Sequence, residues 1–122
     1  MKISKEDFLE MKGKYDKEVK KGKPGKNKNG KIDDQTNWIF FTRETMERVL
    51  AQAGSDPEKG GIQFFITEYS EKTAKKYHPN NPDEYEGRLT IVMKPIKDAG
   101  LIGDDEEGDF ENSGKQCPPD CF

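Results

Sequence analysis

Length, composition and charge limit what this chain can be. Its 122 residues suit one domain, yet only 30% are apolar and 37% are charged, so either the core is thin or part of the chain does not pack. No apolar run approaches the ~20 residues that cross a bilayer, and residues 1–7 lack the apolar stretch of a secretory signal. We therefore expect a soluble cytoplasmic protein without membrane contact, whose thiols stay reduced.

The net charge of −3 is unevenly distributed along the sequence. Residues 12–31 carry nine lysines against two acidic residues, a local balance of +7, whereas residues 98–122 carry eight acidic residues against one lysine, a balance of −7. The lysines are not interleaved with arginines or aromatic platforms, which argues against nucleic acid as a partner. Association between the two oppositely charged segments explains the pattern more simply.

The first predicted element is a helix over residues 5–21. Ser4 is a suitable N-cap and Gly22 a suitable left-handed C-terminal residue. Apolar residues recur between them at helical spacing: Phe8, Met11, Tyr15 and Val19. Residues 22–35 follow, rich in Lys, Gly and Asn, and their composition indicates a flexible linker.

A strand, a helix and two further strands are predicted next. Residues 38–41 form a short apolar strand, and Thr42 can cap a helix. The expected buried stripe of that helix is Met46, Val49, Leu50 and Ala53. Alternating apolar residues predict strands over 62–69 and 88–95, joined by a long polar connection that begins with a helical turn or two.

These elements predict an α+β fold. We expect a small three-stranded, mainly antiparallel sheet with two helices packed on one face, in a domain of residues 1–97 with an extended acidic tail at 98–122. The helices would cover the face that carries Ile62, Phe64, Ile66, Leu89, Ile91 and Met93. Phe65, Tyr69 and Val92 would then lie on a second apolar face, which the tail or another molecule must cover.

Three segments together carry a resemblance. They are residues 38–46 (WIFFTRETM), the strand pair at 61–66 (GIQFFI) and 89–95 (LTIVMKP), and a tail reading N-x-G-x-x-C-P-P-x-C over 112–121. This arrangement resembles a group of small uncharacterised bacterial α+β proteins with the order helix, strand, helix, hairpin and a Pro-containing tail. The resemblance covers residues 36–122, implies the fold, and brings no activity or functional residues with it.

The two cysteines and the single histidine are the candidates for chemistry. Cys117 and Cys121 could close a small disulfide through a turn, supply half of a zinc site, or belong to an inert tail. Zinc prefers four ligands, and His78 is the other good candidate. A carboxylate could orient His78 as a general base, but no nucleophile motif accompanies it, so the sequence identifies no catalytic residue.

The sheet carries more aromatic residues than one buried face requires. An interaction or dimer surface is therefore predicted from Trp38, Phe40, Phe65, Tyr69, Tyr77 and Tyr85. Sequence alone leaves open which face of the strand at 38–41 is buried. The leading hypothesis is a non-enzymatic protein–protein interaction module that binds another protein or itself. The alternative is a small metal- or thiol-dependent protein that uses Cys117, Cys121 and His78, with zinc as the one cofactor to consider.

Overall fold

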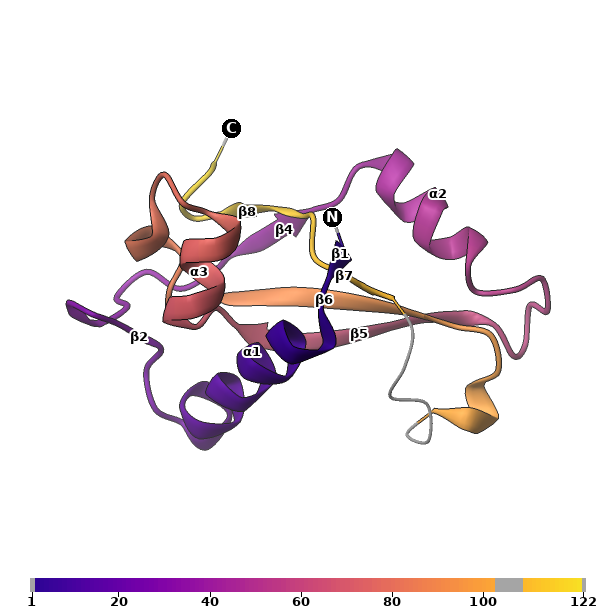
Figure 1. Ribbon diagram of the computed structural model, residues 1–122, viewed down its shortest axis with the longest axis horizontal. Helices are drawn as coiled ribbons and strands as arrows, with labels where there is room; N and C mark the ends of the chain where they lie inside the picture. The colour runs from indigo at the N-terminus through magenta and orange to yellow at the C-terminus, as the bar shows by residue number, and fades with distance from the viewer. Residues whose placement is uncertain (1, 103–108, 122) are drawn as a thin grey trace.

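The computed structural model describes residues 2–102 and 109–121, and within them the main sheet has four antiparallel strands. Their order is β1-β7-β6-β5, comprising β1 (Lys2–Ile3), β7 (Phe110–Glu111), β6 (Leu89–Ile96) and β5 (Gly61–Glu68) (Figure 1). The α+β class is confirmed. The prediction of a three-stranded sheet is wrong, because two short strands from opposite ends of the chain extend the β5–β6 hairpin.

The first helix, α1 (Lys5–Lys17), begins where the sequence predicts. The Ser4 hydroxyl accepts a hydrogen bond of 3.0 Å from the Asp7 backbone N–H, which satisfies one of the free amides at the helix start. A 3₁₀ turn, η1 (Val19–Lys21), follows, and Gly22 ends it with a φ of 82°. The predicted glycine stop is therefore confirmed, although the α-helical part is shorter than expected.

The hydrophobic core lies on the sheet face opposite to the one expected. Phe8 of α1 stacks on Phe110 at 4.4 Å between ring centroids and meets Phe65 edge-on at 4.7 Å. Tyr69 and Val92 are buried in the same cluster, together with Ala74 of α3 (Glu71–Tyr77). The expectation that both helices cover the Phe64 face is wrong, because α1 packs on the opposite face and only α2 (Arg43–Ala51) lies beside Phe64. Both faces of the hairpin are apolar, so periodicity does not select the one that α1 covers.

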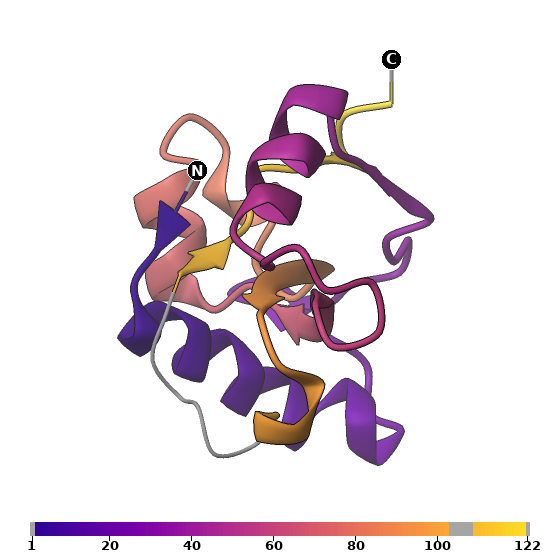
Figure 2. The ribbon, with the colours of Figure 1, turned by 90° about the vertical axis from the view of Figure 1, so that its right-hand side faces the viewer.

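The second long helix, α2 (Arg43–Ala51), lies across the sheet from α1 (Figure 2). Its Val49 is buried, and so is Ala53 just beyond its end, whereas Leu50 is 56% exposed, contrary to the predicted stripe. The two helices therefore do not share one face.

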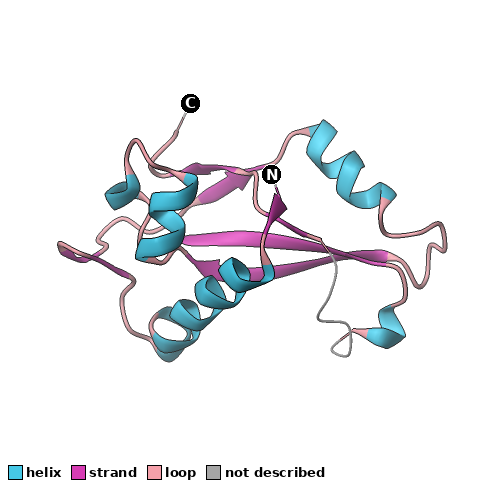
Figure 3. Cartoon of the chain, viewed as in Figure 1, coloured by secondary structure: helices cyan, strands magenta, loops and turns pink. Residues whose placement is uncertain are grey.

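The strand at 38–41 does not join the main sheet. β4 (Trp38–Phe40) pairs instead with β8 (Lys115–Cys117), in a separate two-stranded ladder that lies above β6 in Figure 3. Ile39 is turned inward, where a side chain at Gly114 would lie 2.3 Å from its Cγ2. The C-terminal segment is thus part of the fold rather than a plain extended tail. The acidic run at 104–107 lies outside the described residues.

The prediction of a flexible linker at 22–35 is wrong, because this Lys-, Gly- and Asn-rich segment is folded and packs on residues 82–89. It holds a hairpin of β2 (Lys26–Asn27) and β3 (Gly30–Lys31). A Cβ atom on Gly25 would lie 1.9 Å from the Gly87 carbonyl oxygen, so the two backbones touch. Asn27 Nδ2 also donates a 2.9 Å hydrogen bond to the Asp83 carbonyl.

Two short 3₁₀ turns, η2 (Pro82–Glu84) and η3 (Ala99–Leu101), complete the structure. Within the described ranges, no helix combines the length and apolar character needed to cross a bilayer.

Candidate functional site

An apolar groove lies between α2 and β5. It is lined by Met46 and Leu50 from the helix, by Ile62 and Phe64 from the strand, and at its rim by Arg43 and Glu47. Phe64 and Ile66, which point to the same side of β5, are each 51% exposed. We call this surface, formed by Met46, Leu50, Ile62, Phe64 and Ile66, the α2–β5 groove.

The backbone of β5 has an open side along the same residues. Tyr69 N–H donates to the Arg88 carbonyl at 3.0 Å, and the ladder pairs Thr67 with Thr90 and Phe65 with Val92. In an antiparallel ladder, every second residue exchanges hydrogen bonds with its neighbour, so the odd-numbered residues of β5 face β6. Ile62, Phe64 and Ile66 therefore direct their N–H and C=O groups away from β6. Within residues 2–102 and 109–121, no further strand pairs on that side.

The rim of the α2–β5 groove is electrically balanced. Arg43 Nε lies 2.7 Å from Glu47 Oε1, one helical turn away, and both side chains are well exposed. Since the remaining lining residues are apolar, the surface presents little net charge to a partner. It suits an uncharged, extended polypeptide better than a charged ligand.

The six residues predicted to form an interaction surface lie in three different environments. Tyr69 and Tyr85 are buried, so placing them on an exposed surface was wrong. Phe65 and Tyr77 are partly buried and pack against the core. The exposed pair consists of Trp38 and Phe40, with 39% and 48% of their surfaces accessible. Leu50, Phe64 and Ile66, which the sequence analysis assigned to the buried side of α2 and of β5, are instead exposed.

His78 is half-buried and belongs to a polar network with buried partners rather than to an open site. Its ring stacks on Tyr85 at 3.5 Å, and its Nε2 lies 3.1 Å from the Tyr69 hydroxyl. That hydroxyl donates at 2.6 Å to Asn112 Oδ1, while Asn112 Nδ2 donates to Thr90 Oγ1 at 3.0 Å. The single hydroxyl proton is thereby used, so His78 Nε2 carries a proton and donates to Tyr69.

Partial burial changes the acid–base behaviour of His78. Removal from water lowers the pKa of the imidazole to about 4, because the charged form is the one that burial penalises. The ring is therefore neutral at physiological pH. Its contacts with Tyr69 and Tyr85 suit a structural role, and we assign it no catalytic one.

Glu68 forms a second buried cluster at the end of β5. Its side chain is fully buried, and neither carboxylate oxygen has a hydrogen-bond partner among the described residues. Lys14 Nζ lies 3.7 Å from Glu68 Oε2 and 2.9 Å from Glu18 Oε2. Burial, reinforced by the neighbouring Glu18 carboxylate, raises the pKa of Glu68 to about 8, despite the opposing effect of Lys14. Glu68 is therefore largely protonated at neutral pH.

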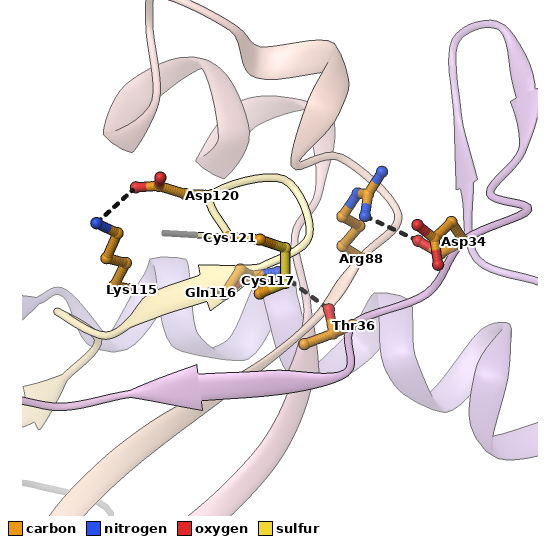
Figure 4. The surroundings of a disulfide bond; sticks show 8 residues. All are labelled: Asp34, Thr36, Arg88, Lys115, Gln116, Cys117, Asp120 and Cys121. Atoms are coloured by element: carbon orange, nitrogen blue, oxygen red, sulfur yellow. Dashed lines mark hydrogen bonds and ion pairs between the residues drawn. A yellow bond between two sulfur atoms is a disulfide. The ribbon is translucent and has the colours of Figure 1, made fainter.

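The cysteines are bonded to each other. Cys117 and Cys121 form a disulfide whose Cα atoms are 4.7 Å apart, closed by a turn at 118–119 (Figure 4). In this form the sulfurs are not thiolates and cannot ligate zinc as the sequence suggests. In the described part of the chain, no cluster of three or more His, Cys, Asp or Glu side chains has the arrangement of a metal site.

The segment that carries the disulfide is bonded to Thr36 through Gln116 and is braced across its own turn by Lys115 and Asp120. Gln116 Nε2 donates to Thr36 Oγ1 at 3.0 Å, and Lys115 Nζ lies 3.7 Å from Asp120 across the turn (Figure 4). Cys117 is buried at 6% exposure, whereas Cys121 is exposed. Any reaction of the disulfide would therefore begin at the Cys121 sulfur, which is the accessible one.

Comparison with known proteins gives no relative: no protein-family model, curated protein or solved structure matches this chain.

Proposed function

We propose that this chain is a non-enzymatic protein–protein interaction module that binds through the open edge of β5 and the α2–β5 groove. The observation that supports this most is the coincidence of two features on one strand. Phe64 and Ile66 each expose 51% of their surface, and their backbone groups point away from β6. An exposed apolar patch beside an unpaired strand edge is the combination that β-strand addition uses.

The chemistry of binding follows from this geometry. An extended segment of a partner would exchange backbone hydrogen bonds with Ile62, Phe64 and Ile66 and place every second side chain over the groove. The groups with strongly shifted pKa values, Glu68 and His78, do not line the groove. This separation favours recognition over catalysis at the α2–β5 groove.

A site-specific photo-cross-linker tests the proposal in host cells. A benzophenone amino acid in place of Phe64 is expected to yield light-dependent adducts with polypeptides. The matched control carries the same amino acid in place of Leu9, an α1 residue that is also 51% exposed. Adducts at position 64 that position 9 does not give support the proposal. Equal labelling at both positions, or none at position 64, contradicts it.

A second candidate function, a thiol-dependent protein, is favoured by the Cys117–Cys121 disulfide. Its test is a reductant-dependent mobility shift that the double variant Cys117→Ser/Cys121→Ser must lose. A shift that persists in the variant would remove this candidate.

The redox state of the two cysteines depends on the compartment. The cytoplasmic location expected from the sequence implies the reduced form, whereas an oxidising compartment would preserve the bond. Alkylation of the thiols in intact cells distinguishes the two.

A further inference from the structure

We infer that the polypeptide recognised by the β5 edge is a second copy of this chain, joined by antiparallel pairing of β5 with β5. The inference rests on the proposed function and names its partner. Its starting point is that the open residues of β5 are complementary to themselves. A two-fold axis through Phe64 pairs Phe64 of one copy with Phe64 of the other, and Ile62 with Ile66.

Hydrogen bonding follows the same register. Ile62, Phe64 and Ile66 all direct their N–H and C=O groups to the open side, so each of these pairs exchanges both of its backbone hydrogen bonds. The two four-stranded sheets then become one continuous sheet. Because the axis is perpendicular to the sheet, the apolar side chains of both copies remain on one side. The two α2–β5 grooves meet there.

The low charge of the β5 edge allows it to pair with an identical copy, because little electrostatic repulsion opposes the contact. Residues 61–67 (GIQFFIT) contain no charged residue and no proline, and all of them pair with β6 in unbroken register, without a bulge. Charged residues, prolines and bulges are the features that normally prevent one sheet edge from pairing with another, and this stretch of β5 has none of them. Arg43 and Glu47 neutralise each other at the groove rim, and the net charge of −3 produces little repulsion between copies.

The opposite edge of the sheet, formed by β1, is protected against such pairing, unlike β5. β1 has only two residues, and one of them is Lys2, whose ammonium group pairs with Asp109 at 3.2 Å. A short edge with a lysine is a protected edge. β5 has eight residues and no such protection between Gly61 and Thr67. Edge-to-edge pairing is therefore expected at β5 and not at β1.

The size of the surface sets the expected affinity. The apolar patch of a typical monomer spans roughly 300–600 Å², and specific interfaces bury about 800 Å² per partner. An interface made of one strand edge and one groove is expected to bury an area near the lower limit for specific interfaces. We therefore expect a dissociation constant on the order of 1–100 µM.

Sedimentation velocity on the purified full chain tests the inference across roughly 1 µM to 1 mM. The mass is expected to rise from 13.9 kDa toward twice that value. Phe64→Lys places a charge at the centre of the pairing and is expected to weaken association at least about tenfold. Leu9→Lys, which adds the same charge at an equally exposed site on α1, should leave it unchanged.

Two results would overturn self-pairing. One is a wild-type chain that remains monomeric at the highest concentration, a result independent of whether any variant folds. The other is equal weakening by Phe64→Lys and Leu9→Lys. If position 64 still cross-links to a different polypeptide in cells, the interaction module stands and only its partner was misidentified. If neither self-association nor a position-64 adduct is seen, both proposals fail.

Discussion

The hydroxyl of Tyr69 donates a 2.6 Å hydrogen bond to Asn112 Oδ1, and this contact joins the end of β5 to the C-terminal segment. Both residues are buried. The Asn112 amide continues the connection to the Ile91 carbonyl at 2.7 Å. A residue of the sequence-predicted tail is therefore fixed to the hairpin by polar contacts inside the core.

Removing that hydroxyl tests the network. Tyr69→Phe leaves Asn112 Oδ1 and His78 Nε2–H without their partner in a buried site, which is expected to cost about 1–3 kcal/mol of unfolding free energy. Urea denaturation measures the loss. Tyr15→Phe, at a half-buried site on α1, should change stability by less than about 0.5 kcal/mol. Equal effects of the two variants would contradict the network.

Glu68 makes stability fall as the pH rises. Its folded-state pKa of about 8 exceeds the ordinary glutamate pKa of 4.5, so between these values the folded chain binds more protons than the unfolded chain. The stabilisation is complete below pH 4.5 and is lost as the pH rises through 8.

Glu68→Gln should remove this dependence of stability on pH and make the protein more stable than wild type at pH 9. Denaturant midpoints at pH 6, 7.5 and 9 measure it. Glu71→Gln, at an exposed site on α3, should keep the wild-type slope.

His78 makes stability fall as the pH decreases, which is the opposite of the effect of Glu68, and it does so in the acidic range. Its folded-state pKa is about 4, whereas the ordinary histidine pKa is 6.5, so the contribution to stability is present above pH 6.5 and is lost as the pH falls toward 4. NMR titration of the ring carbon-bound protons should show no protonation between pH 7 and 5.5. A midpoint near 6.5 would mean that the ring is exposed to water and that the stacking on Tyr85 is wrong.

The disulfide is expected to stabilise the chain modestly. A bond that closes so short a loop removes about 2 kcal/mol of unfolded-state chain entropy, and Cys117 lies in β8 beside β4. Reduction should therefore lower the unfolding free energy by about that amount. The double variant Cys117→Ser/Cys121→Ser should match the reduced wild type and be insensitive to reductant. A reductant effect on the variant would show that the loss arises elsewhere.

Local signals in the sequence predicted the helices and the central hairpin well. Ser4 and Thr42 cap α1 and α2, and Ser70 begins α3, because capping depends on residues that are neighbours in the chain. Alternation located β5 and β6 to within a residue. These features need no knowledge of distant contacts.

Features that depend on distant contacts were not predictable in the same way. β1 and β7 have two residues each, too few for a periodic pattern, and they exist because chain ends 107 or more residues apart pair with each other. The buried face of β5 depends on which side α1 reaches, and Phe64 and Phe65 are equally suitable for burial by type. The groove at Phe64 was missed for that reason.

Hydrogen exchange of the β5 amides tests the central claim most directly. In dilute solution, the amides of Ile62, Phe64 and Ile66 should exchange quickly while those of Gln63, Phe65 and Thr67 are protected by β6. At high concentration, the first set should become protected and the second should not change. If all these amides are equally protected when dilute, or if the first set stays unprotected at every concentration, the β5 edge is not the binding surface for a second copy.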